Sequence, residues 1–166
     1  MNPVIRSATE ADAPLILQFI RELAEYERLT HEVEATEERL RATLFGPRPF
    51  AETLIASVNG EPSGFAVFLP NYSTFLAQPG LYLEDIYVRP PFRGCGLGTA
   101  LITAVARIAV ERGCGRYEWS VLEWNTPAIR FYKSLGAEMY GDWRRMRVTG
   151  AALSALAQRA THERKA

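Results

Sequence analysis

A strand that runs directly into a glycine-rich loop and then into a helix is the feature that most constrains how this sequence folds. The segment Tyr87-Val88-Arg89-Pro90-Pro91-Phe92-Arg93-Gly94-Cys95-Gly96-Leu97-Gly98 contains three alternating glycines. Glycine lets the backbone approach a ligand closely, and the free amides and the dipole of a helix N-terminus add positive potential. The segment therefore predicts an anion site suited to a phosphate or pyrophosphate, or else a tight turn and helix cap that hold nothing.

Two familiar phosphate loops do not fit this segment. A dinucleotide fingerprint requires Gly-x-Gly-x-x-Gly/Ala, but its last position is Thr99 when counted from Gly94 and Leu101 when counted from Gly96. A nucleoside-triphosphate loop requires Gly-Lys-Ser/Thr, and this loop has no lysine. An anion site in this loop would therefore be neither a dinucleotide-binding loop nor a nucleoside-triphosphate loop.

Hydrophobic periodicity and turn residues predict a mixed α/β chain. We expect helices over about 10–28, 37–44, 98–112, 126–135 and 151–159. We expect strands at Val4–Arg6, Thr53–Val58, Gly64–Leu69, Leu81–Val88, Tyr117–Leu122, Glu138–Tyr140 and Arg144–Val148, with Asn59-Gly60 as a hairpin turn. The strands come in blocks, so the order is of the α+β type and not the strict alternation of a doubly wound sheet.

Length, charge and cysteine content narrow the class further. The 166 residues suit a single domain, 1–166, and 19 basic side chains balance 19 acidic ones, which gives no support for a nucleic-acid or membrane partner. The start of the sequence shows no secretory signal, and Cys95 and Cys114 form neither a metal pattern nor a disulfide framework. We expect a cytoplasmic protein with no metal.

The loop also carries a family motif. Arg93-x-x-Gly96-x-Gly98 matches the Gln/Arg-x-x-Gly-x-Gly/Ala motif, and it follows the expected strand Leu83-Glu84-Asp85-Ile86-Tyr87-Val88. Glu123-Trp124-Asn125 and Ile129-Arg130-Phe131-Tyr132-Lys133 follow in family order. The chain thus resembles the GNAT superfamily of N-acetyltransferases, and in particular the diamine and thialysine acetyltransferases. The resemblance implies a mixed, mostly antiparallel sheet of about six to seven strands flanked by helices.

The resemblance implies that acetyl-coenzyme A is the cosubstrate. Amides of the glycine loop would hold its pyrophosphate, and backbone groups of the preceding strand would pair with the pantetheine arm. Cys95 would be a small loop residue, the alternative being a catalytic thiol. The residues implied for cofactor binding are Ile86, Tyr87, Val88, Arg93, Gly94, Cys95, Gly96, Leu97, Gly98, Thr99, Asn125, Ala128, Tyr132 and Lys133.

Two residues are predicted to be catalytic. Tyr132 is the expected general acid, because a phenol with a pKa near ~10 can protonate a departing thiolate; the alternative is a packed aromatic beside Phe131. Glu84 is the carboxylate that the resemblance selects to attract the amine and pass its proton to water, the alternative being a solvated charge. Glu84 and Asp85 are expected to face opposite sides of their strand. Asn125 is expected to contact pantetheine, to cap a helix, or both.

The acceptor is expected to be a small primary amine. The resemblance implies that Tyr26, Glu27, Glu84, Glu118 and Trp119 form its site, while Trp143 is either a late family tryptophan or a core residue. Ser73 and Thr74 stand where polyamine enzymes have an aspartate, which favours a lysine-like acceptor over a polyamine. The resemblance also implies a homodimer. A protein acetyltransferase and a non-catalytic acyl-coenzyme A sensor remain alternative functions.

Overall fold

A five-stranded sheet organises the larger of two compact units. The computed structural model describes residues 3–142 and 144–162, with side chains described up to residue 159. One unit covers residues 1–120 and the other residues 121–166, and each is described by itself. The expectation of a single domain over 1–166 stays a prediction.

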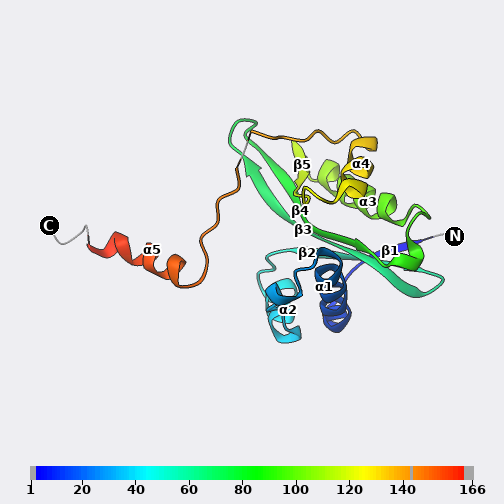
Figure 1. Ribbon diagram of the computed structural model, residues 1–166, viewed down its shortest axis with the longest axis horizontal. Coiled ribbons are helices and arrows are strands. Elements are labelled where there is room, and N and C mark those ends of the chain that lie inside the picture. The colour runs from blue at the N-terminus through cyan, green and yellow to red at the C-terminus, as the bar shows by residue number, and fades with distance from the viewer. Residues whose placement is uncertain (1–2, 143, 163–166) are drawn as a thin grey trace. The chain divides into compact units, whose positions relative to one another are not determined.

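The sheet has the strand order β1-β2-β3-β4-β5 (Figure 1). The first four strands are antiparallel neighbours, and β5 runs parallel to β4. Asn59 and Gly60 join β2 to β3 with φ angles of 53° and 82°, as a tight two-residue hairpin requires, which confirms the predicted turn. The strands are β1 Val4–Ser7, β2 Glu52–Val58, β3 Glu61–Ser73, β4 Gln78–Val88 and β5 Arg116–Trp119.

Helices cover both faces of this sheet. The 3-10 turn η1 (Glu10–Asp12), α1 (Ala13–Glu27), η2 (Thr30–Glu32) and α2 (Glu37–Leu44) come before β2 in the chain, and η3 (Pro90–Phe92) and α3 (Leu97–Glu111) separate β4 from β5. In Figure 1, α1 and α2 lie against one face and α3 against the opposite face. Thr36 caps α2 by accepting a hydrogen bond from the Arg39 amide at 3.2 Å. The second unit contains α4 (Thr126–Ser134) and α5 (Gly150–His162).

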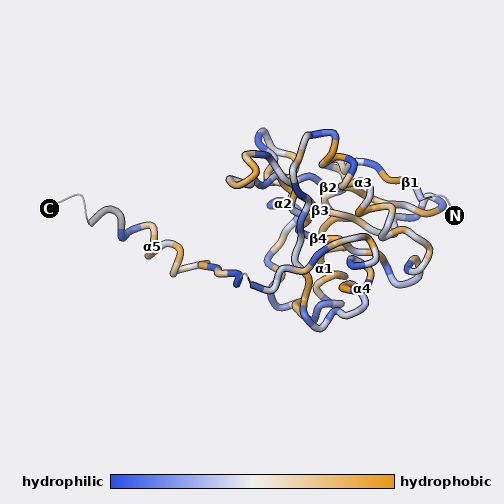
Figure 2. Tube along the Cα trace, turned by 90° about the horizontal axis from the view of Figure 1, so that it is seen from above, coloured by the Kyte–Doolittle hydropathy of each residue, from blue (hydrophilic) through white to orange (hydrophobic). Residues whose placement is uncertain are grey.

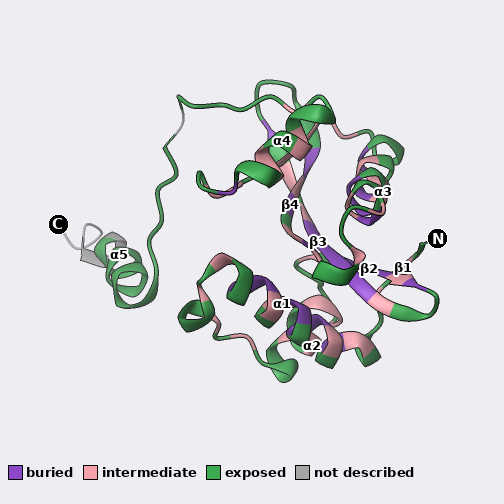
Figure 3. Ribbon diagram, turned by 45° about the vertical axis from the view of Figure 1, so that its right-hand side comes forward, coloured by how far each residue is buried: buried purple, intermediate pink, exposed green. Residues whose placement is uncertain are grey.

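The core lies between the sheet and its helices. Hydrophobic residues run along α1, α3 and the central strands (Figure 2), and buried positions gather on the same elements (Figure 3). On the α1 side, the rings of Phe19 and Phe65 stack at 5.2 Å between centroids. On the α3 side, Leu101, Ile102, Val105 and Ala109 are buried, as the helical spacing predicts.

The predicted count of six to seven strands is wrong for the described residues. Residues 138–140 and 144–148 have no regular secondary structure, and β5 ends at Trp119 instead of Leu122. A strand needs a neighbour to complete its hydrogen bonds, and none of the described residues pairs with these segments. Met139, Tyr140 and Met146 are exposed, so burial does not support a strand there either. Trp143 lies outside the described residues.

Replacing Phe65 should lower the free energy of unfolding. Phe65 is fully buried and stacks on Phe19, so the Phe65→Ala variant should lose about 3–5 kcal/mol of unfolding free energy in a denaturant titration. Phe75 is 95% exposed, so Phe75→Ala is the matched control and should change stability by less than about 0.5 kcal/mol. Equal losses in both variants would contradict the assignment of Phe65 to the core.

Candidate active site

The carboxyl-terminal half of β4 has one edge that β5 does not cover. The parallel ladder joins Gly80 to Arg116 and ends where Leu83 pairs with Trp119, whereas β4 continues to Val88. On its other edge, β4 stays paired with β3 as far as Gly64 and Val88. Apart from the Val88 carbonyl, which accepts a hydrogen bond from Arg93 Nε, the backbone groups of residues 84–88 on the β5 side are therefore available to an extended ligand, in the way that a peptide adds a strand to a sheet.

A β-bulge lies where this edge begins. Val67 pairs with Asp85 and Phe68 pairs with Leu83, so Glu84 is the extra residue of β4. A bulge breaks the alternation of side chains and redirects them, and the charge of Glu84 is close enough to raise the pKa of Asp85. The expectation that these two acids face opposite sides of their strand stays a prediction.

The glycine loop follows β4 and opens into α3. Gly94 and Gly96 have φ angles of 77° and 86°, and a Cβ on either would meet no atom within 4 Å. Gly96 is also the N-cap of α3, with its carbonyl accepting the Ala100 amide at 2.9 Å. The amides of the first helical turn, Leu97 to Thr99, have no acceptor within the helix. The loop thus places free donors beside open space, as an anion site requires.

Arg93 and Cys95 are both turned back onto the protein. Arg93 Nε donates to the carbonyl of Val88 at 2.8 Å, and its guanidinium lies over the Tyr26 ring at 4.7 Å. The Cys95 thiol donates to the Phe92 carbonyl at 2.8 Å. This contact favours the interpretation of Cys95 as a small loop residue.

Three carboxylates, those of Glu27, Glu84 and Asp85, lie close to one another near the bulge. Asp85 lies on the same face as Tyr87, two residues on, whose ring is 6.4 Å from that of Phe19 in α1. Burial raises the pKa of Asp85 to about 7, with smaller contributions from the charges of Glu84 and Glu27. Burial also raises the pKa of Glu27, the last residue of α1. Among the ion pairs of the described residues, none involves these three acids, so the cluster keeps its affinity for a cation.

Asp85 is the residue that the sequence reasoning passed over. A carboxyl group with a pKa of about 7 exchanges protons at neutral pH more readily than an ordinary carboxylate does. A signal was present in the sequence, because Asp85 stands directly before the apolar run that starts at Ile86. Its burial depends on the pairing with Val67, which a single strand does not reveal.

The two predicted acceptor residues on β5 lie on opposite faces of that strand. Glu118 accepts a hydrogen bond from Asn71 Nδ2 at 2.9 Å and lies 3.3 Å from Arg116 Nε. Trp119 packs its ring against Tyr117 at 5.0 Å. Adjacent residues of a regular strand point to opposite faces, and Glu118 already has two polar partners. The part of Glu118 and Trp119 in acceptor binding stays a prediction.

The second unit holds the remaining predicted residues. Asn125 is the N-cap of α4, and its Oδ1 accepts the Ala128 amide at 3.3 Å, so the capping interpretation is confirmed and the pantetheine contact stays a prediction. Tyr132 lies on α4 with its ring 5.4 Å from that of Phe131, and Lys133 is in the last turn of the same helix. Their part in cofactor binding stays a prediction.

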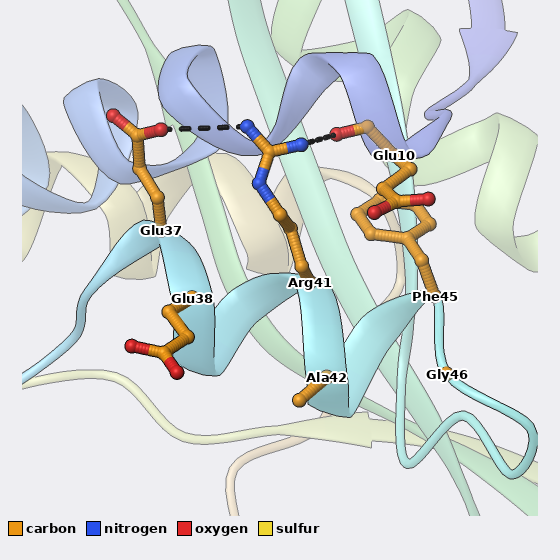
Figure 4. Close-up of a pocket in the computed structure, with 7 residues that line it drawn as sticks. All are labelled: Glu10, Glu37, Glu38, Arg41, Ala42, Phe45 and Gly46. Carbon is orange, nitrogen blue, oxygen red and sulfur yellow. Dashed lines mark hydrogen bonds and ion pairs between the residues drawn. The ribbon is translucent and has the colours of Figure 1, made fainter.

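A separate surface pocket contains none of these residues. It has a volume of about 550 Å³ and is lined by Glu10, Glu37, Glu38, Arg41, Ala42, Phe45 and Gly46 (Figure 4). Arg41 crosses it to donate to the Glu10 carbonyl at 3.0 Å and to the Glu37 carboxylate at 3.4 Å, so the arginine ties η1 to α2.

The described residues contain neither a cluster of metal ligands nor a membrane-spanning helix. Over residues 3–142 and 144–162, no three His, Cys, Asp or Glu side chains come together as metal ligands would. Within the same part of the chain, every helix falls short of the length and apolarity needed to cross a bilayer.

The burial of Asp85 gives a pH-dependent stability. The pKa of Asp85 in the folded protein, about 7, lies above its ordinary value of 3.8. The stability that the protonated Asp85 contributes to the folded state is therefore fully present below pH 3.8. It is lost as the pH rises to about 7. The Asp85→Asn variant avoids this loss, so its advantage in unfolding free energy should grow over that window by at most about 1.4 kcal/mol per pH unit.

Denaturant titrations from pH 4 to pH 8 measure this difference. The Glu84→Gln variant removes one of the charges that raise the pKa of Asp85, so it should shift the window to lower pH. A constant difference between wild type and Asp85→Asn at every pH would contradict the raised pKa.

Comparisons with known proteins agree with this geometry. The acetyltransferase (GNAT) family model matches residues 16–137. A thialysine N-epsilon-acetyltransferase from Sus scrofa is 42% identical over 165 residues, covering 93% of this chain and 96% of its own length. An L-ornithine N5-acetyltransferase from Arabidopsis thaliana is 38% identical over 197 residues, covering 92% and 86%.

The fold itself also has solved relatives. An integron cassette protein from the mobile metagenome of V. cholerae superimposes with a TM-score of 0.79 at 25% identity, covering 95% of this chain and 99% of the relative. The family model spans most of the chain, and the relatives named above match nearly all of it. The chain belongs to the acetyltransferase (GNAT) family and is an N-acetyltransferase.

Proposed function

We propose that this enzyme moves the acetyl group of acetyl-coenzyme A onto the side-chain amine of a lysine-like or ornithine-like small molecule, by direct attack in a ternary complex. The observation that carries the proposal is the uncovered edge of β4, which starts at an acidic bulge and ends at an open glycine loop. An extended thioester arm fits such an edge, and its pyrophosphate fits the amides at the start of α3.

The charge of the acceptor site supports a cationic amine. Glu27, Glu84 and Asp85 have no arginine or lysine in the described ion pairs, whereas Glu22, Glu52 and Glu118 each have an arginine partner. A positively charged acceptor would balance the three free acids. The relatives that act on thialysine and ornithine support an acceptor with an amine side chain.

The β3–β4 hairpin supports an amino acid over a polyamine. Ser73 is buried, and its hydroxyl accepts the Leu76 amide at 3.3 Å, so it has a structural task in the turn. Thr74 beside it carries no charge. This turn therefore offers no carboxylate for a second ammonium group, as a polyamine would need.

The proposed chemistry requires three proton movements. The bound ammonium group first loses a proton, through water, to the carboxylates of Glu84 and Asp85. The free amine then attacks the thioester carbonyl and forms the new C–N bond. As the C–S bond breaks, Tyr132 gives its phenolic proton to the departing sulfur, and the second proton of the attacking nitrogen passes through water to the tyrosinate. Asp85, with its pKa of about 7, is better matched than an ordinary carboxylate to take a proton near neutral pH.

The proposal also includes a cytoplasmic homodimer, which rests on the family resemblance. Tyr26 and Glu27 are proposed acceptor contacts, and so are Glu118 and Trp119, of which Glu118 is the weaker candidate because Asn71 and Arg116 already engage it.

The first experiment follows thiol release from acetyl-coenzyme A with thialysine, lysine, ornithine, spermidine, an aminoglycoside and a lysine-containing peptide. Amino acids with an amine side chain should react best. The Tyr132→Phe variant should lose about 10- to 100-fold in kcat while it binds coenzyme A as wild type does. Tyr140 is 77% exposed, so Tyr140→Phe is the matched control and should keep full activity.

Other results would point to the alternative functions. Turnover with the peptide alone would identify a protein acetyltransferase. Tight binding of coenzyme A with no turnover of any amine would identify a sensor. Undiminished kcat in Tyr132→Phe would remove the tyrosine from the mechanism.

A matched pair of glycines tests the phosphate loop. Gly96 and Gly113 have φ angles of 86° and 67° at the two ends of α3, and neither has an atom within 4 Å of an added Cβ. Alanine at either position should therefore cost a similar ~1–2 kcal/mol of stability through backbone strain. Only Gly96→Ala should weaken coenzyme A binding, by about tenfold, in a calorimetric titration. Equal affinity in both variants would exclude the loop as the pyrophosphate site.

A further inference from the structure

Two arginines at the two ends of the η3 turn reach back to α1. Arg89 is the residue after β4, and its Nε and Nη2 donate to the two carboxylate oxygens of Glu22 at 2.9 and 2.8 Å. Its guanidinium also lies 4.8 Å from the centroid of the Phe19 ring. This bidentate pair is mostly buried, so it fixes the start of the turn against the helix.

Arg93 makes the second connection, at the other end of the turn. Its Nε holds the carbonyl of Val88, and its guanidinium lies 4.7 Å from the Tyr26 ring and 5.6 Å from the Tyr87 ring. A cation over an aromatic face is attracted to the electrons of the ring. The side chain thus faces the helix, while its backbone continues directly into Gly94 and the anion loop.

Both arginines act on one face of α1. Phe19, Glu22 and Tyr26 are separated by three and four residues, so they lie along a single stripe of the helix. Tyr26 is followed by Glu27, whose charge reaches Asp85 beside the β4 bulge. Arg93 therefore contacts the same end of α1 that carries Glu27, one of the three acids near the bulge.

We propose that Arg93 is a positioning residue that links the two halves of the active site. It holds Tyr26, and with it the end of α1, in the place where the acceptor amine binds. This inference rests on the proposed function, because it takes the glycine loop as the cosubstrate site and the acidic cluster as the acceptor site. It assigns to this arginine a task in acceptor binding as well as its place in the loop motif.

Coupling between the sites follows from the covalent arrangement. When Gly94 to Gly98 close around a pyrophosphate, the backbone of Arg93 loses freedom, and its guanidinium is restricted to the ring of Tyr26. The acceptor then binds to a helix end that is already ordered, so its binding costs less conformational entropy of the protein. By reciprocity, the acceptor strengthens binding of coenzyme A by the same factor.

Four proteins test the coupling: wild type, Arg93→Gln, Tyr26→Leu and the double variant. Glutamine is a residue that the loop motif tolerates at this position, so the loop keeps a familiar sequence. Arg112→Gln is the matched control, because the guanidinium of Arg112 likewise lies over an aromatic ring, 6.0 Å from that of Phe68. Arg112 pairs with the Glu52 carboxylate and follows the far end of α3. The readouts are the acceptor KM at saturating acetyl-coenzyme A and the Kd of coenzyme A alone.

The expected result separates the two sites. Arg93→Gln should raise the acceptor KM by about three- to tenfold and change the Kd of coenzyme A by less than about threefold. In the Tyr26→Leu background, the same replacement should add nothing further to the acceptor KM. A loss of coenzyme A affinity with an unchanged acceptor KM, or additive effects in the double variant, would overturn the proposal.

A second readout needs no acceptor and no turnover. Binding of coenzyme A should slow amide hydrogen exchange in residues 22–29 of wild type and of Arg112→Gln, but not of Arg93→Gln at equal occupancy. If coenzyme A slowed exchange in residues 22–29 of Arg93→Gln as much as in wild type, the proposal would be overturned. A wild type that acetylates none of the amines would contradict the proposed function alone, because the exchange measurement would still decide the role of Arg93.

Discussion

The separation of β4 from β5 is the constraint on which the rest of this site depends. The parallel ladder stops at Leu83 and Trp119, while β4 continues along β3 as far as Val88. The polar backbone along the uncovered edge has to find partners in water or in a ligand. The bulge at Glu84 stands at the start of this edge and sets Asp85 opposite Val67. The end of the parallel ladder and the bulge thus bring the uncovered edge next to the acids.

Electrostatic organisation distinguishes this region from the surrounding surface. Most acids close to arginine are neutralised, as Glu22, Glu52 and Asp12 are. The acids near the bulge have no such partner within the described residues, and partial burial raises the pKa of Asp85. A buried acid without a cation reduces stability at neutral pH. Such a cost is typical of groups that are kept for binding or catalysis.

The sequence predicts much of this structure and fails in ways that have physical causes. Local signals are enough for the Asn59-Gly60 hairpin, the Asn125 cap and the helix α3 with its buried stripe, because each depends on neighbouring residues alone. The strands expected at 138–140 and 144–148 fail because strand formation depends on a partner, which no alternating pattern supplies. The burial of Asp85 was missed because it depends on the register between β3 and β4.

Arg93 shows the same limit at the level of a single side chain. A motif relates residues along the loop, so it associates Arg93 with the phosphate site that the glycines form. The side chain instead contacts Val88 and Tyr26, which belong to a strand and a helix outside the motif. Arg93 is constrained by both sites. Moving its backbone would change the glycine loop, and moving its guanidinium would change the end of α1 at the acceptor site. The arginine is therefore better understood as part of the connection between cosubstrate and acceptor than as a contact of either one alone.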